Sequence, residues 1–201
     1  DNLITLLNKT TQILCDWFSK ADKYGPLPFD ENFKCLMPDE DGNSTEDLFS
    51  DIQSLLNNSF NPVHPGSLAH LDPPPLIFSI LGDLIAAGLN NNLLAYELSP
   101  SITLLEDSLC KWFAKKIGFN DSSGGIAASG GTLSNLNALI AARHNSGLGS
   151  DPNSVLLVSE DAHSSFIKCI RIMGLDEANL IRIKTDNNGS IDIQNLRKTI
   201  D

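Results

Sequence analysis

The sequence predicts an α/β fold, in which a parallel-rich sheet is flanked by helices and preceded by a helical N-terminal arm. The first observation is that strand-like and helix-like segments alternate from residue 125 onward, a pattern typical of parallel strands joined by helical crossovers. The second is that apolar residues before that point recur at helical spacing. The third is the length of 201 residues, which is enough for one large domain with an arm.

Helices and one irregular segment are expected in the first part of the chain. Apolar side chains at helical spacing predict a helix over residues 2–20. A polar, acidic stretch then leads into a short helix around residues 45–57. Residues 61–75 contain five prolines, which fix φ and remove backbone donors. This segment is therefore expected to be ordered but neither a helix nor a central strand.

Two further helices are expected before the alternating region. The first covers about residues 76–89, where apolar residues gather on one face. The second begins at Ser99, which suits the N-cap, and it has Pro100 at its first helical position. Gly118 suits the end of this second helix.

The alternating region is expected to hold three strands and three helices. The strands are residues 125–129, 154–159 and 179–184, and the helices are residues 132–144, 163–173 and 192 onward. With about three strands, the sheet is expected to be incomplete in this chain, so that another polypeptide covers its apolar edges. Both chain ends are also expected to be cut, because residue 1 is Asp rather than Met and the chain stops inside an apparent helix.

Composition and charge exclude several classes of protein. The formal net charge is −11 and the pI is about 4.6, which argues against nucleic acid or an anionic membrane as the main partner. No apolar run approaches the roughly 20 residues that span a bilayer, and no signal peptide opens the chain. The four cysteines are scattered without a CxxC pair. We therefore expect reduced thiols, no zinc site and a cytoplasmic location.

A glycine turn is the first candidate site. Residues 129–135 read SGGTLSN and lie between a predicted strand and a predicted helix. The first amides of a helix lack intrahelical partners and carry positive potential, so this position suits an anion. Gly130 and Gly131 remove side chains that would block close approach, and Thr132 adds a hydroxyl. The alternative is a tight strand–helix connection with Thr132 as the N-cap.

Three known motifs compete for this stretch. A P-loop needs a lysine where this chain has Gly131, which argues against a nucleoside triphosphate. The GxGxxG fingerprint of dinucleotide-binding folds is absent. A nucleophile elbow would use Ser129 with an acid and a base downstream. Asp161 and His163 are the candidates for that pair, but they are closer in sequence than a hydrolase requires, so this interpretation is disfavoured.

His163 is the second candidate. It lies in SEDAHSSF, residues 159–166, directly after a predicted strand, and ligands of open α/β sheets collect at the carboxyl ends of strands. A single histidine is more often a helix cap or a surface residue. Here it is expected at the sheet edge that also carries the glycine turn, where its flat ring could stack on a flat ligand. A phosphate together with a planar ring indicates pyridoxal phosphate.

Four segments together resemble the group II pyridoxal-phosphate-dependent amino-acid decarboxylases. They are NPVHPGSLAHLDPPP, NNNLLAYELSPSITLLEDSLCKWF, SGGTLSNLNALIAAR and SEDAHSSF. They stand in the order and spacing of that family, and the resemblance runs from about residue 61 to residue 201. The subgroup most similar by eye contains 2,4-diaminobutyrate decarboxylases, with similarity also to glutamate and cysteine-sulfinate types. The resemblance implies the large domain of a fold-type I transferase-like protein that binds pyridoxal 5'-phosphate.

The resemblance also implies roles for individual residues at the cofactor. Gly131 and Thr132 match the phosphate-binding turn, with Gly130 beside them. His163 matches the histidine that stacks on the cofactor ring and takes part in catalysis. These are the cofactor-binding residues and the catalytic residue that we expect in this chain, and no metal is expected.

The N-terminal residues are assigned from the same resemblance. His70, Leu71 and Asp72 match a segment that lines the substrate entrance. Residues 1–60 correspond to a helical dimerisation arm, and residues 61–201 correspond to the first part of the cofactor-binding domain. The partners implied are an amino-acid substrate, a second copy of the chain and a missing C-terminal portion, with neither nucleic acid nor membrane.

The activity implied is decarboxylation of an L-amino acid to the amine and carbon dioxide. In the family, the cofactor-tethering lysine and the ring-facing aspartate come from later strands, and Lys168 and Lys184 fall on the wrong elements for that role. This chain alone is therefore expected to be inactive. Two alternatives stay open: a non-catalytic remnant or scaffold with the same fold, and another pyridoxal-phosphate-dependent carbon–carbon lyase.

Overall fold

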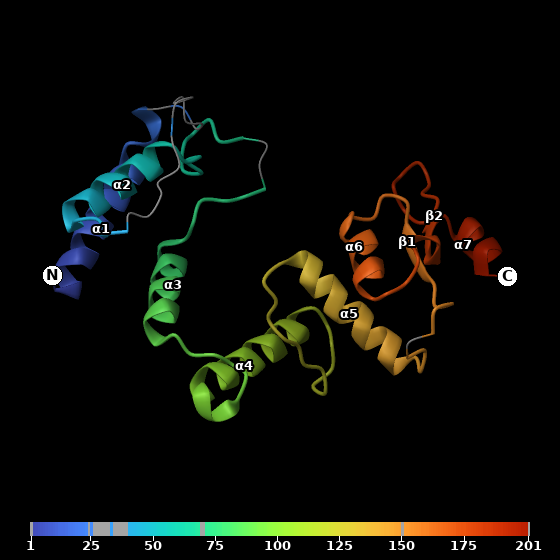
Figure 1. Ribbon diagram of the computed structural model, residues 1–201. Coiled ribbons are helices and arrows are strands. Elements are labelled where there is room, and N and C mark those ends of the chain that lie inside the picture. Colours follow the sequence, from blue (N-terminus) through green and yellow to red (C-terminus); the bar gives the residue numbers. More distant parts are fainter. Residues whose placement is uncertain are drawn as a thin grey trace. The chain divides into compact units, whose positions relative to one another are not determined.

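The computed structural model describes residues 2–23, 25, 33, 40–68, 71–149 and 151–200. The chain forms two compact units, Asp1–Asn90 and Asn91–Asp201 (Figure 1). The predicted division at residues 60 and 61 concerns the arm and the domain of a complete protein, and it stays a prediction.

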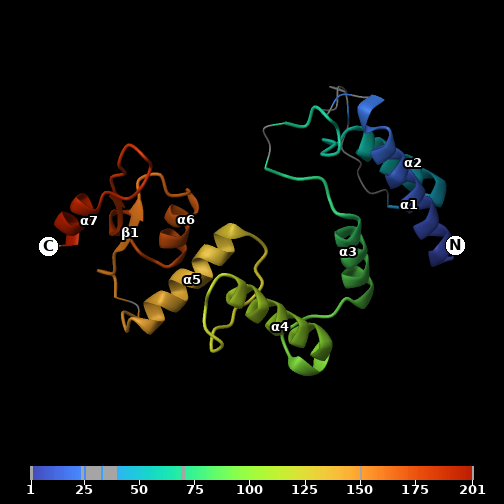
Figure 2. The ribbon, with the colours of Figure 1, turned by 180° about the vertical axis from the view of Figure 1, so that it is seen from behind.

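A helical pair forms the centre of the first unit. Helix α1 (Leu3–Ser19) lies beside α2 (Thr45–Asn57), and the two remain side by side in both views (Figures 1 and 2). Phe49 of α2 is buried, with the Lys9 ammonium of α1 at 4.1 Å from the centroid of its ring. A short 3-10 helix, η1 (Ala21–Lys23), follows α1. These elements confirm the helices predicted over residues 2–20 and 45–57.

The proline-rich segment is irregular, as predicted. Its described residues form turns without helix or strand. The buried Asn61 side chain donates to the carbonyl of Trp17 at 3.4 Å, and this bond ties the start of the segment to α1. Helix α3 (Ile77–Leu89) comes next, close to the predicted bounds.

Helix α3 is apolar nearly all the way round. Asp83 is the one charged residue in its sequence, IFSILGDLIAAGL. Most of its large side chains are exposed within the described part of this chain, Ile77 by 76% and Phe78 by 84%. Helices of this composition are typically buried on all sides.

The second unit begins with η2 (Tyr96–Leu98) and α4 (Pro100–Lys116). Ser99 is the N-cap residue and Pro100 the first helical residue, as predicted, although the Ser99 side chain makes no capping hydrogen bond. Gly118 follows the helix with φ +88°, a left-handed conformation that favours glycine. The predicted start and stop of α4 are therefore confirmed.

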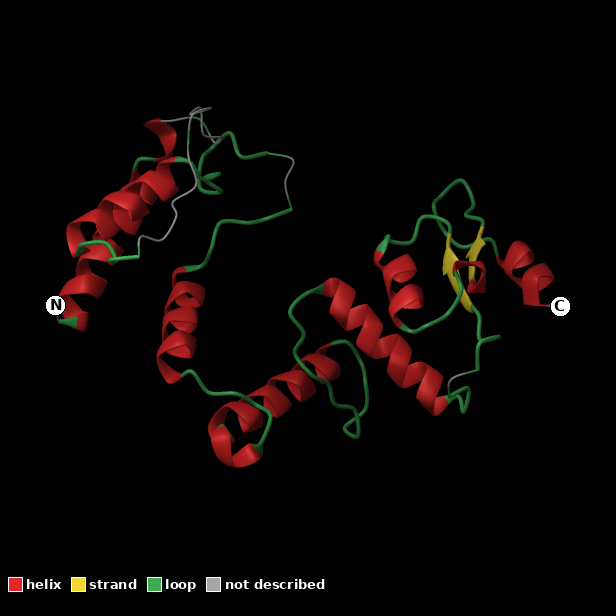
Figure 3. Ribbon diagram, viewed as in Figure 1, coloured by secondary structure: helices red, strands yellow, loops and turns green. Residues whose placement is uncertain are grey.

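A small parallel sheet and its helices complete the second unit. Strand β1 (Leu156–Ser159) pairs with β2 (Leu180–Ile183), with Leu156 opposite Leu180. Helix α5 (Gly131–Asn145) precedes β1, and α6 (Ser165–Ile172) and η3 (Glu177–Asn179) connect the two strands (Figure 3). Helix α7 (Ile193–Ile200) follows β2 and contacts it. The core holds Val158 and Ile183 from the sheet with Cys169 and Ile170 from α6.

The strand predicted over residues 125–129 is wrong for this chain. In the described residues the sheet has two strands, β1 and β2, and residues 125–129 pair with neither. The physical reason is that a strand needs a neighbour to complete its backbone hydrogen bonds. Here the Ala127 N–H donates instead to the Glu106 carboxylate of α4 at 2.8 Å. Glu106 thus anchors the segment that leads into the glycine turn.

Candidate cofactor site

The glycine turn forms the start of α5. Gly130 is the N-cap residue, and no side chain caps the helix. The N–H of Ser134 returns to the Gly130 carbonyl at 3.0 Å. Among the described residues, the amides of Gly131, Thr132 and Leu133 have no hydrogen-bond acceptor. These are the free first-turn donors of a helix, and they make this turn a site for an anion.

Thr132 is not the N-cap, contrary to the alternative explanation of this turn. It is the second residue of α5, and Gly130 takes the capping position. A Thr at the second helical position cannot accept a bond from the next helix amides in the manner of an N-cap. A simple capped connection therefore does not account for the sequence SGGT.

Neither glycine of the turn is required by the chain itself. Gly130 has φ 167°, which is extended backbone open to any residue. A Cβ atom added at Gly130 or Gly131 would meet no other atom within 4 Å. What the two glycines provide is open space beside the free amides. A phosphate group fits this arrangement, because its oxygens need close approach to several N–H groups at once.

His163 lies between β1 and α6 and is exposed. Its Nδ1 accepts a hydrogen bond from the Ser165 N–H at 3.1 Å. A ring nitrogen that accepts such a bond carries no proton, so the neutral ring holds its proton on Nε2. The imidazole is thus held on one side by the backbone at the start of α6 and is open on the other.

Packing of α5 on α6 brings His163 and the glycine turn together. Asn135 of α5 donates from Nδ2 to Oγ of Ser165 at 3.0 Å. The Cys169 thiol lies 3.7 Å from the Thr132 carbonyl, which it contacts as a weak donor. Ser165 and Cys169 are completely buried. The two candidate features were expected to share a sheet edge, but the contact between the first two turns of α5 and of α6 is what joins them.

The hydrolase interpretation does not fit this geometry. A catalytic triad needs the histidine to donate from Nδ1 to an acid, whereas Nδ1 of His163 accepts from a backbone N–H. The Asp161 carboxylate is instead 3.0 Å from the Thr185 hydroxyl. Asp161 therefore bonds to a residue beyond the end of β2, and it does not act on His163 as the acid that a Ser129 nucleophile would require.

Sequence comparison then decides the family. Residues 31–201 match the pyridoxal-dependent decarboxylase conserved domain, which is most of the chain. The chain belongs to the pyridoxal-dependent decarboxylases. The expected cofactor class is confirmed with the family, and the match begins earlier than the segment from residue 61 that carried the resemblance.

Curated relatives in this decarboxylase family differ in the substrates that they are named for. The chain is 28% identical over 169 residues to L-2,4-diaminobutyrate decarboxylase of Acinetobacter baumannii, covering 74% of this chain and 33% of that protein. It is 26% identical over 188 residues to an L-aspartate decarboxylase of Metarhizium robertsii, covering 90% and 37%. It is 28% identical over 165 residues to aromatic-L-amino-acid decarboxylase of Bacillus atrophaeus, covering 80% and 34%. The chain spans about a third of the length of these relatives.

Solved structures confirm the fold class. Mouse CSAD has a TM-score of 0.86 at 22% identity, covering 98% of this chain and 44% of that chain. The glutamate decarboxylase domain of a Vibrio parahaemolyticus protein has a TM-score of 0.85 at 22% identity, covering 98% and 47%. The decarboxylase chain thus has the fold of part of a fold-type I α/β protein, and it covers less than half of each of these solved chains.

The predicted substrate-entrance residues lie in the other unit. Leu71 is 99% exposed and Asp72 is also exposed, and both belong to Asp1–Asn90. His70 lies outside the described residues. The role predicted for these three residues in the decarboxylase stays a prediction.

In the described part of the chain, no helix is long and apolar enough to cross a membrane.

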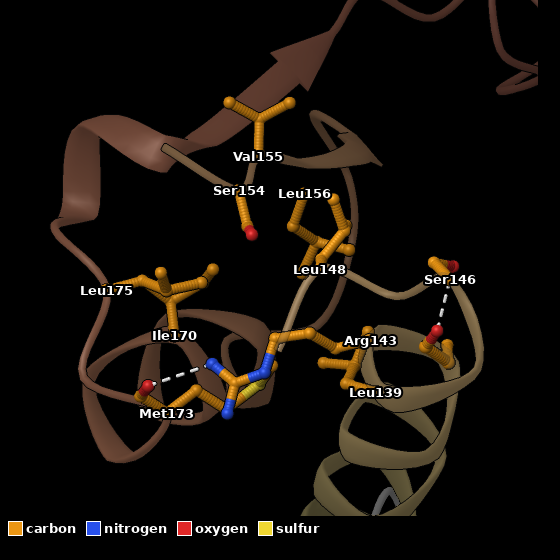
Figure 4. A pocket seen from close by; sticks show the side chains of 11 residues that line it. Leu139, Arg143, Ser146, Leu148, Ser154, Val155, Leu156, Ile170, Met173 and Leu175 are labelled. Carbon is orange, nitrogen blue, oxygen red and sulfur yellow. Dashed lines mark hydrogen bonds between the residues drawn. The ribbon is translucent and has the colours of Figure 1, made fainter. Parts of the chain in front are cut away.

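A cavity that the sequence did not predict lies away from the glycine turn. It has a volume of about 170 Å³ and lies between the C-terminal half of α5, the end of α6 and the entry to β1 (Figure 4). Its walls are mostly apolar. Arg143 also lines the cavity, and its guanidinium donates to the Met173 carbonyl at 3.1 Å. Because Arg143 is in the last turn of α5, this cavity is separate from the candidate phosphate site at the first turn.

A carboxylate at the ends of the two strands shows a shifted pKa. The Glu160 side chain accepts from the Thr185 N–H at 2.8 Å and contacts the Thr185 hydroxyl at 3.1 Å. The backbone bond from Thr185, followed by the bond from its hydroxyl, lowers the pKa of Glu160 below its ordinary value of 4.5. The carboxylate thus ties the loop before His163 to the end of β2.

The shifted pKa predicts how this tie responds to acid. A carboxyl group with a lowered folded-state pKa stabilises the fold above its unfolded pKa, and this contribution is lost as pH falls through the folded value. We expect the Thr185 amide shift to titrate together with the Glu160 carboxyl carbon in an NMR pH titration, below pH 4.5. Thr185→Val removes the hydroxyl but keeps the N–H, so the pKa of Glu160 should rise only part of the way. Glu160→Gln is the control that abolishes the titration of the amide. A pKa of Glu160 at or above 4.5 would contradict the bond.

Proposed function

We propose that the complete protein decarboxylates an amino acid with pyridoxal 5'-phosphate, and that this chain supplies the phosphate cradle and the ring-stacking histidine. The observation that carries the proposal is the pairing of free first-turn amides at Gly131 and Thr132 with an exposed His163 on the adjoining helix start. Family membership supports the cofactor and the class of reaction.

Each residue then has a separate task. The amides after Gly130 would hold the phosphate, and the Thr132 hydroxyl would add a further donor. His163 would lie against the ring and fix its orientation in the site, with Nε2–H free to donate. When bound, the cofactor withdraws the electrons that the departing carboxylate leaves behind. The residues of this chain would bind the cofactor, fix its orientation and present the Nε2 proton of His163.

The tethering lysine is proposed to lie in the part of the relatives' length that this chain does not span. Lys168 is on α6 and Lys184 directly follows β2, and both are exposed. Among the described residues 71–149 and 151–200, we therefore assign no lysine to the role of tethering the cofactor. We propose that the fragment alone is inactive and that residues 1–60 act as an arm of the complete enzyme.

The substrate is proposed to be 2,4-diaminobutyrate, glutamate or a related amino acid. The names of the relatives span basic, acidic and aromatic substrates, so a panel is the direct test. The complete protein, loaded with pyridoxal phosphate, should release carbon dioxide and the matching amine from one member of an L-amino-acid panel. Binding without release of carbon dioxide would favour the scaffold alternative, and cleavage to an aldehyde and a shorter amino acid would favour another carbon–carbon lyase.

Gly131→Ala tests the phosphate cradle. Alanine is favoured over glycine in a helix by about 1 kcal/mol, and the added Cβ meets no atom of the chain within 4 Å. We therefore expect thermal stability without cofactor to be unchanged or raised. The same Cβ occupies the space beside the free amides, so affinity for pyridoxal phosphate should fall about tenfold or more. Gly124→Ala, also unobstructed, is the matched control and should leave both quantities unchanged.

His163→Ala tests the stacking histidine. Loss of the ring should weaken binding of pyridoxal phosphate, because stacking contributes about 1 kcal/mol, and it should also lower kcat. His163→Phe should keep much of the affinity, since a flat ring remains, while kcat stays low because Nε2–H is gone. The exposed His144 near the end of α5 provides the control His144→Ala. Unchanged affinity and turnover in His163→Ala would remove the proposed role.

A homodimer in the cytoplasm is proposed for the complete protein. The exposed apolar surface of α3 supports the dimer. The cytoplasmic location is supported by the free thiols of Cys15, Cys110 and Cys169. Sedimentation at micromolar concentration should give twice the chain mass, and Phe78→Glu together with Ile85→Glu on α3 should shift the complete protein toward monomer. A purely monomeric parent would exclude the dimer.

A further inference from the structure

We propose that Asn135 is a positioning residue, which fixes the proton position and orientation of His163 through Ser165. The observation is a continuous hydrogen-bond chain from the α5 side chain to the imidazole ring. Asn135 Nδ2 donates to Ser165 Oγ at 3.0 Å, and the Ser165 N–H donates to His163 Nδ1 at 3.1 Å. The use of His163 toward a cofactor rests on the proposed function, whereas the hydrogen-bond chain itself does not.

Ser165 is the central member of this chain. It is the first residue of α6 and has no exposed surface. Its N–H has no partner within the helix, as at every helix start, and the imidazole of His163 accepts it. The Ser164 side chain makes no capping bond. The His163 ring accepts the Ser165 N–H, and the His163 carbonyl accepts the next one, from Phe166, at 3.2 Å. Any movement of Ser165 therefore moves the donor that holds Nδ1.

Asn135 is what fixes Ser165 from the other helix. Among the residues that the structure describes, it provides the hydrogen bond between an α5 side chain and an α6 side chain, while Cys169 and Arg143 bond to backbone carbonyls. Asn135 is half-buried, so this bond is partly protected from water. Without Asn135, the buried Ser165 hydroxyl would have no hydrogen-bond partner. Because this is costly, we expect Ser165 to shift until its hydroxyl finds another partner.

The consequence is a coupling between the two parts of the site. Asn135 lies one turn along α5 from Gly131, whose amide is in the candidate phosphate cradle. A rigid helix turn and two hydrogen bonds thus connect the cradle to the His163 ring. With Nδ1 held as an acceptor, Nε2 keeps its proton and the ring keeps one orientation. Asn135 acts on the ring only through Ser165.

The experiment uses the complete protein labelled with ¹⁵N-histidine, studied both with and without pyridoxal phosphate. In the parent, the His163 nitrogen shifts should show an unprotonated Nδ1 and a protonated Nε2. Asn135→Ala should give a mixture of both tautomers without cofactor. With cofactor, kcat should fall about five- to tenfold while the dissociation constant of pyridoxal phosphate changes less than about threefold, because the cradle amides remain.

Two further variants keep the test decisive. The side chain of Asn137, two residues along α5, makes no hydrogen bond in the described part of the chain, so Asn137→Ala is the matched control and should behave as the parent. Ser165→Ala keeps the N–H but removes Oγ, so it should reproduce the Asn135→Ala spectrum, and the double variant should add nothing to either single change. If one variant fails to fold, the other still decides the result.

The outcomes separate this proposal from the proposed function. A parent spectrum with protonated Nδ1, an unchanged spectrum in both variants, or an equal change in Asn137→Ala would overturn the positioning role. A complete protein that binds no pyridoxal phosphate would instead overturn the proposed function, and the tautomer measurement without cofactor would still stand. Loss of cofactor binding in Asn135→Ala alone would show a contact with the cofactor and would contradict action through Ser165.

Discussion

The contact between the first two turns of α5 and of α6 is the interaction on which the candidate site depends. Ser165 and Cys169 are fully buried there and meet Asn135 and Thr132 from α5. Since the glycine turn starts one helix and His163 precedes the other, neither feature could be placed relative to the other without this contact. Buried hydrogen bonds of this kind are costly to leave unmade, so they select one arrangement of the two helix starts.

Local sequence signals predicted the helices well, because each acts within a few residues. Pro100 and Gly118 define the ends of α4 through fixed φ and left-handed φ, respectively. Non-local features were harder. Residues 125–129 have the composition of a strand, but a strand also needs a partner, and the Glu106 side chain takes up the Ala127 N–H in the described part of the chain. The contact that joins His163 to the turn was missed because a helix pair has no local signature.

The site residues were predictable in type and not in geometry. Gly130 and Gly131 signalled close approach of a ligand, and their open surroundings are consistent with that reading. The position of Thr132 inside the helix, rather than at its cap, depends on where α5 begins, which sequence reasoning places only to within a residue or two. The bond from the Ser165 N–H that sets the His163 tautomer depends on where the backbone lies at the start of α6, and no sequence motif predicts it.

The residues proposed to face the cofactor relate to the class of reaction more than to the substrate. The proposed phosphate cradle and stacking ring would meet parts of pyridoxal phosphate that are the same for every amino acid, which accords with relatives named for diaminobutyrate, aspartate and aromatic substrates. Discrimination between these side chains requires contacts with groups that differ among them, such as a charge or an apolar pocket. Under the proposed function, α5 and α6 would supply the contacts that are common to all substrates. Substrate selection would then depend on residues that face the substrate side chain, whether from the segment with Leu71 and Asp72 or from polypeptide beyond this chain.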